Sequence, residues 1–197
     1  MTTSRPKQSW TPLVAEFAQR KKDKEFRAKR SALRAGSGTY TEFRAYSYVL
    51  PFLGEKTLRS TKTALLRCMA ALAEYPDVVS SGEKATASSV GQWVNRVAFD
   101  GKQGQSEPDS MVASRIKYLH TQDLEEAISS CGASWHLPTE KNVTTKLNPY
   151  QFVELFWYWG NGFTDASTKH RLSVLRDFYS TKQKENTDPQ SSSEGEK

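Results

Sequence analysis

Residues 58–72, Leu-Arg-Ser-Thr-Lys-Thr-Ala-Leu-Leu-Arg-Cys-Met-Ala-Ala-Leu, decide the fold class of this 197-residue chain. Leu58, Leu65, Met69 and Leu72 recur at the spacing of one helix face. A proline four residues after the last of them lies where a helix cannot continue. The stretch therefore predicts an amphipathic helix, and basic side chains occupy its other face.

The same period recurs on both sides of this stretch. Thr11-Pro12 and Asn148-Pro149 each read as an N-cap residue followed by proline at the first helical position. Glycine pairs at 36–38 and 160–162 end two of the patterns. Helical spacing predicts further helices over residues 11–34, 41–50, 90–97, 111–119, 124–131, 150–159 and 167–179. In the last of these we expect Leu172, Leu175, Phe178 and Tyr179 to point inward.

The pattern predicts an all-α fold, because no segment shows the sustained alternation of a half-buried strand. We expect two antiparallel helical bundles packed together, an N-terminal one over residues 10–98 and a C-terminal one over residues 109–180. Polar loops at 77–88 and 100–109 interrupt the helices. Residues 181–197 are too polar to pack, so we expect a disordered tail.

Positive charge is concentrated in one segment. The chain has 28 Lys and Arg against 22 Asp and Glu, a formal net charge of +6. Residues 20–34 alone contain eight basic residues against Asp23 and Glu25. A localised excess of this kind attracts polyanions, among which nucleic acid is the most common in a cell. A solvated helix face without a partner explains the same pattern equally well.

A shared surface would turn these cations into a nucleic-acid site. Lysines and arginines on one stripe contact phosphates without reading bases, so binding would be independent of sequence and sensitive to salt. The helical spacing permits such a stripe and does not require it. Its members would be Arg27, Lys29, Arg30, Arg34, Arg59, Lys62, Arg67 and Arg115.

The sequence offers no catalytic residues, metal site or cofactor. His120, His136 and His170 are far apart, and the two cysteines are not at zinc-ligand spacing. Neither a phosphate-binding glycine loop nor a nucleophile elbow occurs. We expect a cytoplasmic protein with reduced thiols, because the chain has neither an export signal nor an apolar run of membrane-spanning length.

The aromatic residues between 150 and 163 have two interpretations. Aromatic side chains near cations can stack on single-stranded bases. Here they lie at helical spacing within an apolar helix, so packing in the core is the better explanation.

The order of segments resembles the small subunit of the type I-E CRISPR Cascade surveillance complex, the CasB family. The resemblance covers about residues 30–180, and its pieces are short and helical, so their order and spacing carry it. The matching stretches are Ser31–Arg34, Tyr46–Leu53, Ala64–Arg67, Ser88–Gly91, Ser114–Leu119 with Asp123-Leu124, Leu155–Trp159 and Arg171–Tyr179.

The resemblance implies an all-α, non-catalytic subunit with N-terminal and C-terminal bundles. In this family two copies lie head to tail beside the subunits that hold the guide RNA. Their basic surface supports the guide RNA–target DNA heteroduplex and the displaced DNA strand. The implied partners are therefore the backbone and large Cascade subunits, a second copy of the chain, CRISPR guide RNA, and the target and displaced strands.

Nine residues are the candidates for nucleic-acid contact. Arg34, Arg67, Arg115 and Arg171 match motif positions of the family. Charge and placement alone add Arg27, Arg30, Arg59, Lys62 and Lys169. We expect replacement of Arg34, Arg67 and Arg115 by Ala to weaken binding with little change in stability.

Two features limit the resemblance. The family usually carries paired arginines at the start of the segment that includes Arg115, whereas this chain has Ser114 there, and Thr121 replaces a later basic residue. The stretch from Cys131 to Asn148 is also longer than in the family. The alternative function is a freestanding helical DNA-binding regulator, which would require a helix-turn-helix with a base-reading helix.

Overall fold

The computed structural model describes residues 8–55, 57–81, 89–99, 110–133, 135 and 146–184. Pairing of extended backbone within these ranges is limited to one isolated parallel bridge between Val79 and Leu147, so the all-α prediction is confirmed. The α-helices are α1 (Thr11–Arg20), α2 (Arg27–Arg34), α3 (Tyr46–Val49), α4 (Arg59–Glu74), α5 (Val90–Ala98), α6 (Ser110–Leu119), α7 (Leu124–Ala133), α9 (Pro149–Trp157) and α10 (Asp165–Lys184). Short 3-10 turns are η1 (Ala35–Ser37), η2 (Glu42–Ala45) and η3 (Leu50–Phe52).

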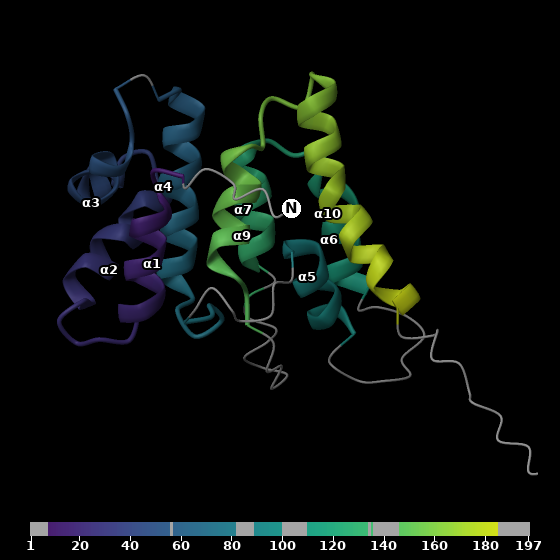
Figure 1. Cartoon of the computed structure of the whole chain (residues 1–197), viewed down its shortest axis with the longest axis horizontal. Coiled ribbons are helices and arrows are strands. Elements are labelled where there is room, and N and C mark those ends of the chain that lie inside the picture. The colour runs from purple at the N-terminus through teal and green to yellow at the C-terminus, as the bar shows by residue number, and fades with distance from the viewer. Residues whose placement is uncertain are drawn as a thin grey trace, which may run out of the picture.

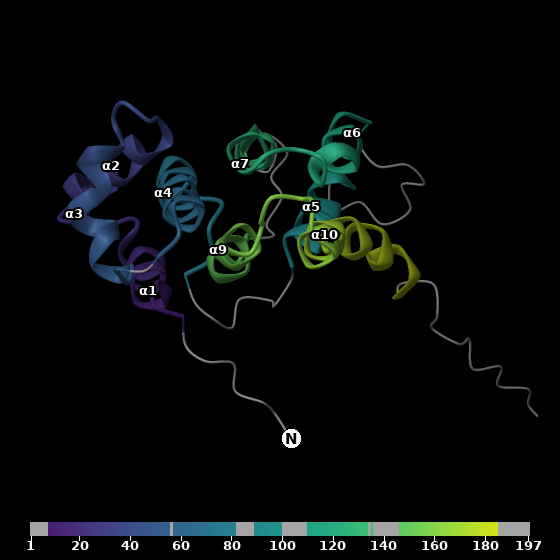
Figure 2. The same ribbon diagram turned by 90° about the horizontal axis from the view of Figure 1, so that it is seen from above.

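The helices lie in two layers (Figure 1). Seen from above, α2, α4, α7 and α6 follow one another along one side of the molecule, and we call them the first layer (Figure 2). The second layer consists of α1, α9, α5 and α10. Helix α4 is central, because it packs against α2 and α7 in its own layer and against α9 in the other.

Helix α4 is the element that the sequence predicts most clearly. Leu65, Met69 and Leu72 are fully buried, as their spacing predicts. Leu58 differs, since it is 71% exposed and lies in extended backbone just before the helix begins at Arg59. Neighbours on three sides explain why most of the helix beyond Thr63 is buried.

A row of aromatic rings joins the two ends of the core. Trp93 of α5 meets Trp135, which meets Phe152 of α9, and the row continues through Phe156 to Trp159. The ring centroids of successive residues are 5.0–6.4 Å apart, and all five side chains are buried. Among the aromatic residues between 150 and 163, the predicted core position is confirmed for Phe152, Phe156 and Trp159, whereas Tyr158 and Phe163 are 45% and 92% exposed.

The start of α9 follows its predicted capping pattern. The side-chain oxygen of Asn148 accepts hydrogen bonds from the backbone N–H groups of Tyr150 (3.0 Å) and Gln151 (3.3 Å), and Pro149 occupies the first turn. Thr11 was expected to cap its helix in the same way. Instead, α1 begins at Thr11 itself, and Trp10 precedes it without a side-chain cap.

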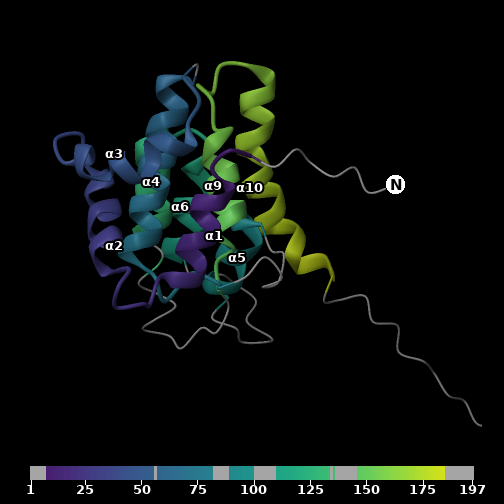
Figure 3. The same ribbon diagram turned by 60° about the vertical axis from the view of Figure 1, so that its left-hand side comes forward.

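Two predicted helices are interrupted. The expected helix over residues 11–34 consists of α1 and α2, because the chain reverses between them and brings Phe26 back onto Phe17, with ring centroids 6.2 Å apart. The expected helix over residues 41–50 is divided into η2, α3 and η3, of which only Ala45 and Val49 are buried. Few buried side chains are available there to stabilise a longer helix. Figure 3 shows α1, α2 and α3 around α4.

Helix α10 is longer than predicted, and its buried face is shifted. Ser167, Arg171, Val174 and Phe178 form the buried stripe, whereas Leu172 and Tyr179 are 40% and 56% exposed, so the inward orientation predicted for these two is wrong. Because the helix continues through Lys184, residues 181–184 do not belong to a disordered tail. The rest of the predicted tail, residues 185–197, lies outside the part of the chain that the structure describes.

The two predicted bundles exchange helices. Helix α5, which belongs to the N-terminal segment, packs mainly on α10, and α9 of the C-terminal segment packs mainly on α4. Buried residues of both segments form one continuous core. The domain boundaries proposed from the sequence stay a prediction, and much of the loop segments 77–88 and 100–109 lies outside the described residues.

Candidate nucleic-acid interface

The structure separates the nine predicted cations into two groups. Seven lie in the first layer, on α2, α4 and α6: Arg27, Arg30, Arg34, Arg59, Lys62, Arg67 and Arg115. Lys169 and Arg171 belong to α10 in the second layer. Most of the candidates therefore belong to helices of the first layer, and the two on α10 do not.

Arg67 is buried and ties three elements together. Its guanidinium is bound to Glu42 at 2.8 Å and to Glu125 at 2.7 Å. It also donates to the Gly36 carbonyl oxygen at 2.5 Å and to the Thr39 hydroxyl at 3.4 Å. Because its side chain is only 7% exposed and its donors are occupied, Arg67 is a structural residue. Its predicted contact with a nucleic-acid strand stays a prediction, and its burial does not favour it.

Glu42 completes the cluster around Arg67. Burial alone would raise the pKa of its carboxyl group. Hydrogen bonds from Tyr46 and Arg67 outweigh burial and hold the pKa below its usual value. The carboxylate is therefore charged at neutral pH, as its pairing with the buried guanidinium requires.

Arg171 is also structural. It donates to the backbone carbonyl oxygens of Trp159 (3.0 Å), Gly160 (2.8 Å), Gln122 (3.0 Å) and His120 (3.3 Å). Its guanidinium also lies 4.8 Å from the centroid of the Trp159 ring. Burial lowers its pKa, although Asp123 opposes the shift. The residue joins α10 to the α6–α7 turn and to the end of α9. Its predicted contact with a strand stays a prediction, and its internal hydrogen bonds do not favour it.

Arg34 remains at the surface and is held by one carboxylate. Its Nε donates to Glu74 Oε2 at 2.5 Å, and its Nη2 donates to Glu74 Oε1 at 2.9 Å. The Arg34 side chain is 51% exposed and that of Glu74 is 45% exposed. The hydrogen bonds that Arg34 donates to Glu74 raise the pKa of Arg34. This pair joins α2 to the end of α4.

The other first-layer candidates differ in their surroundings. Arg30 donates to the Lys21 carbonyl oxygen, and Lys62 Nζ lies 4.3 Å from the centroid of the Tyr46 ring. Arg115 is half-buried. Arg27 and Arg59 are exposed at the first residues of α2 and α4, so they are the candidates best placed to meet a strand.

A groove runs between α4 and α7, and we call it the α4–α7 groove. One part encloses about 630 Å³ and is lined by Arg67, Glu74, Arg115 and Glu125 among others. A neighbouring recess of about 370 Å³ is lined by Arg59 and shares Glu125 with the first. The groove thus extends along the whole of α4, and charged side chains of both signs line it.

A cluster of lysines near Asp77 was missed by the sequence analysis. Lys22 Nζ lies 2.8 Å from the Asp77 carboxylate, and Lys146 donates to the Asp77 carbonyl oxygen at 2.8 Å. Lys21 is buried and donates to the carbonyl oxygen of Val79. Lys22 belongs to the basic run that the sequence shows, whereas Lys146 comes from a segment whose helical pattern could not be recognised. The β-bridge between Val79 and Leu147 places the neighbouring Lys146 beside Asp77.

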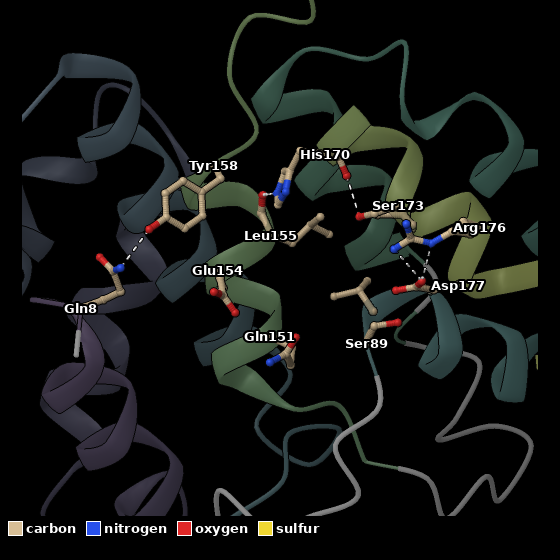
Figure 4. A pocket seen from close by; sticks show the side chains of 13 residues that line it. Gln8, Ser89, Gln151, Glu154, Leu155, Tyr158, His170, Ser173, Arg176 and Asp177 are labelled. Atoms are coloured by element: carbon tan, nitrogen blue, oxygen red, sulfur yellow. Dashed lines mark hydrogen bonds and ion pairs between the residues drawn. The ribbon is translucent and has the colours of Figure 1, made fainter. Parts of the chain in front are cut away.

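A separate polar recess of about 510 Å³ opens between α9, α10 and the start of α5 (Figure 4). Gln8 donates to the Tyr158 hydroxyl at 2.8 Å, and His170 Nε2 donates to the Leu155 carbonyl oxygen at 2.8 Å. The Ser173 hydroxyl donates to the backbone of His170 rather than to an imidazole. The residues that line this recess are different from those that line the α4–α7 groove.

Cys68 and Cys131 are both buried, free thiols. Burial raises the pKa of Cys131 to about 12 and raises that of Cys68 well above its usual value, so both are protonated at neutral pH. Within the described ranges, no three His, Cys, Asp or Glu residues gather where they could hold a metal ion. None of the helices seen there is both long and apolar enough to cross a membrane.

Comparison with known proteins finds a solved structure with a similar fold. A scan of protein families and a search of curated proteins find no match. The crystal structure of a CRISPR-associated protein of the Cse2 family from Thermus thermophilus is similar, with a TM-score of 0.62 and 17% sequence identity. The similarity covers 88% of this chain and 99% of that one. Cse2 proteins are type I-E small subunits, so the resemblance seen in the sequence is confirmed at the level of the fold. The chain therefore has the fold of a Cse2-family CRISPR-associated protein over most of its length.

Proposed function

We propose that this protein is the non-catalytic small subunit of a type I-E Cascade complex, an RNA-guided DNA surveillance complex of antiviral defence. Its partners would be the backbone and large subunits, a second copy of itself, guide RNA, and the target and displaced DNA strands. Its place of action would be the cytoplasm. The observation that carries the proposal is the similarity to the Cse2-family fold across 88% of the chain, together with the ordered motifs of the sequence.

The first layer is the part of the molecule best suited to contact nucleic acid. Arg27 and Arg59 are exposed there, and Arg34 lies at the surface beside the α4–α7 groove. Lys22 and Lys146 add positive charge near the α1–α2 turn. Arg67 and Arg171 take no part, because their donors are occupied inside the protein.

Charge-based contact agrees with the role of a small subunit. In RNA-guided recognition, base pairing reads the target sequence, and the protein holds the strands through their backbone. Side chains of Arg and Lys bind phosphates of any sequence and release counterions, so affinity falls as salt concentration rises. The proposed subunit would therefore stabilise the heteroduplex and the displaced strand without selecting bases.

Co-expression with the other type I-E subunits and a guide RNA tests the assignment. We expect the chain to co-purify with a complex that contains the guide RNA. Purification of the chain without RNA and without the other subunits would overturn the proposal. Sequence-selective DNA binding by the isolated chain would instead favour a freestanding regulator.

A pair of double variants tests the surface. Arg27→Ala with Arg59→Ala removes two exposed cations of the first layer. Arg96→Ala with Arg176→Ala removes two cations of the second layer, one from α5 and one from α10, and serves as a control of equal charge. We expect the first pair to weaken target DNA binding by the complex about tenfold and to reduce the salt slope, while the second pair has little effect. Equal losses from both pairs would show that net charge, and not this surface, governs binding.

A further inference from the structure

The Arg34–Glu74 pair has the geometry of an anion site that is already filled. Two parallel hydrogen bonds of 2.5 and 2.9 Å join the guanidinium to the carboxylate. A phosphate presents two oxygens to arginine in the same fork arrangement. The position that a strand phosphate would take on Arg34 is therefore occupied by a side chain of the protein itself.

Exposure makes this pair exchangeable. Both side chains are about half exposed, and solvent-exposed ion pairs add little to stability. The buried Arg67 is the contrast, since Glu42 and Glu125 hold it together with the backbone oxygen of Gly36. Of these two arginines at the groove, only Arg34 can change its partner without disturbing the core.

Arg34 shares a face of α2 with two other groups that suit a strand. Arg27, Ser31 and Arg34 are all exposed. Ser31 follows Arg27 by four residues and Arg34 follows it by seven, which is the spacing of one helix face. The two arginines are about 10 Å apart along the helix axis, roughly three nucleotide steps of a helical strand. Hydroxyl groups such as that of Ser31 also bind phosphates.

We infer that Glu74 is a specificity-determining residue of this surface: its carboxylate occupies Arg34 in the free protein and is displaced by a strand phosphate. This inference rests on the proposed function, because it concerns the same nucleic-acid contact. A single small phosphate that displaces the Glu74 carboxylate from Arg34 gains little binding free energy, because it only exchanges one anion for another of similar geometry. A strand that engages Arg27 and Arg34 together gains more, so Glu74 favours extended polyanions over small anions.

Replacing Glu74 by Gln tests this directly. Glu74→Gln keeps the shape of the side chain and frees Arg34 from its charged partner. The purified full chain is titrated into a fluorescent single-stranded oligonucleotide at several salt concentrations. We expect binding to tighten about two- to fivefold, because the strand no longer has to break an ion pair, while the slope of log affinity against log salt changes little, since Arg34 neutralises one phosphate in both proteins. Unchanged affinity, or no binding by either form even at low salt, would overturn the inference.

Two controls separate the release of Arg34 from a general increase in positive charge. Glu55→Gln makes the same charge change at an exposed carboxylate that forms no ion pair with a described residue. We expect a smaller gain from it than from Glu74→Gln. In an Arg34→Ala background, Glu74→Gln should increase the affinity for the oligonucleotide no more than Glu55→Gln does, because the arginine that it would free is absent. Equal gains with and without Arg34 would refute the inference.

The outcome is distinguishable from failure of the proposed function. The titration uses the isolated chain, whereas the Cascade assignment depends on co-purification with guide RNA and the other subunits. If the chain fails to assemble but binds more tightly after Glu74→Gln, the role of Glu74 is supported and the Cascade assignment is refuted. If the chain assembles but its affinity does not change after Glu74→Gln, the Cascade assignment is supported and the role of Glu74 is refuted.

Discussion

At the scale of single residues, arginine takes three roles that the sequence alone does not distinguish. Arg67 and Arg171 are buried, Arg34 is held at the surface by Glu74, and Arg27 is exposed. The basic run and the motif positions predicted which residues carry charge. Their burial depends on how α4 packs against α2 and α7 and how α10 packs against the α6–α7 turn, and no local pattern reveals this packing.

Lys21 gives a pH dependence with a definite sign. Burial, with the nearby Lys22 and Lys146 as smaller contributions, lowers its pKa from 10.5 to about 8, while Asp77 opposes the shift. Between these two values the unfolded chain binds a proton that the folded chain has lost, so stability rises with pH across this window. Relative to a Lys21→Met variant, we expect the wild type to gain about 2–3 kcal/mol between pH 7 and pH 10.

Urea denaturation of both proteins at a series of pH values measures this difference. Taking the difference between the two proteins cancels the other lysines, tyrosines and thiols, which titrate in the same range. A gap between the two curves that stays constant with pH would show that Lys21 keeps its proton in the folded state.

At the scale of elements, hydrophobic spacing predicted where helices occur better than where they end. The regular stripes of α4, α5 and α9 gave the right elements, because each buries a continuous face. The break between α1 and α2 was missed, since the contact of Phe26 with Phe17 that accompanies it is a tertiary feature. The stripe of α10 was displaced because an arginine and a serine, not only apolar residues, lie on its buried face.

The crossing of α5 and α10 depends on Gly91. A Cβ atom at this position would clash with the Val174 carbonyl oxygen and would lie 2.9 Å from the Phe178 backbone nitrogen. Since backbone atoms of a packed helix cannot move aside cheaply, we expect Gly91→Ala to destabilise the protein by about 2 kcal/mol or more. The shift of the urea midpoint measures this.

Gly132 of α7 is the matched control for Gly91. A Cβ atom there would meet no heavy atom of the described residues within 4 Å, so Gly132→Ala adds a better helix former without a clash among them. We expect this change to stabilise the protein by up to about 1 kcal/mol. If both substitutions destabilised the protein equally, loss of glycine and not the crossing would be responsible.

At the scale of the whole molecule, the exchange of α5 and α9 between the two halves joins the halves into one core. Each of these helices buries its apolar face on a helix from the other predicted segment. We therefore expect a single cooperative unfolding transition, with near-equal calorimetric and van't Hoff enthalpies. Far-ultraviolet circular dichroism, which follows the helices, should coincide with near-ultraviolet signals from Trp93, Trp135 and Trp159. Two separate transitions would show that the halves fold independently.

The interleaving of the helices has a consequence for how this chain can vary. If the chain were divided between α5 and α6, one fragment would contain α4 without α9 and α5 without α10, and the other would contain α9 and α10 without these partners. Each fragment would therefore expose apolar surface and tend to aggregate. Neither half can be inherited, lost or transplanted by itself. Successful fusions and length changes should therefore be found at the termini or between helices, where no exchanged pair is divided.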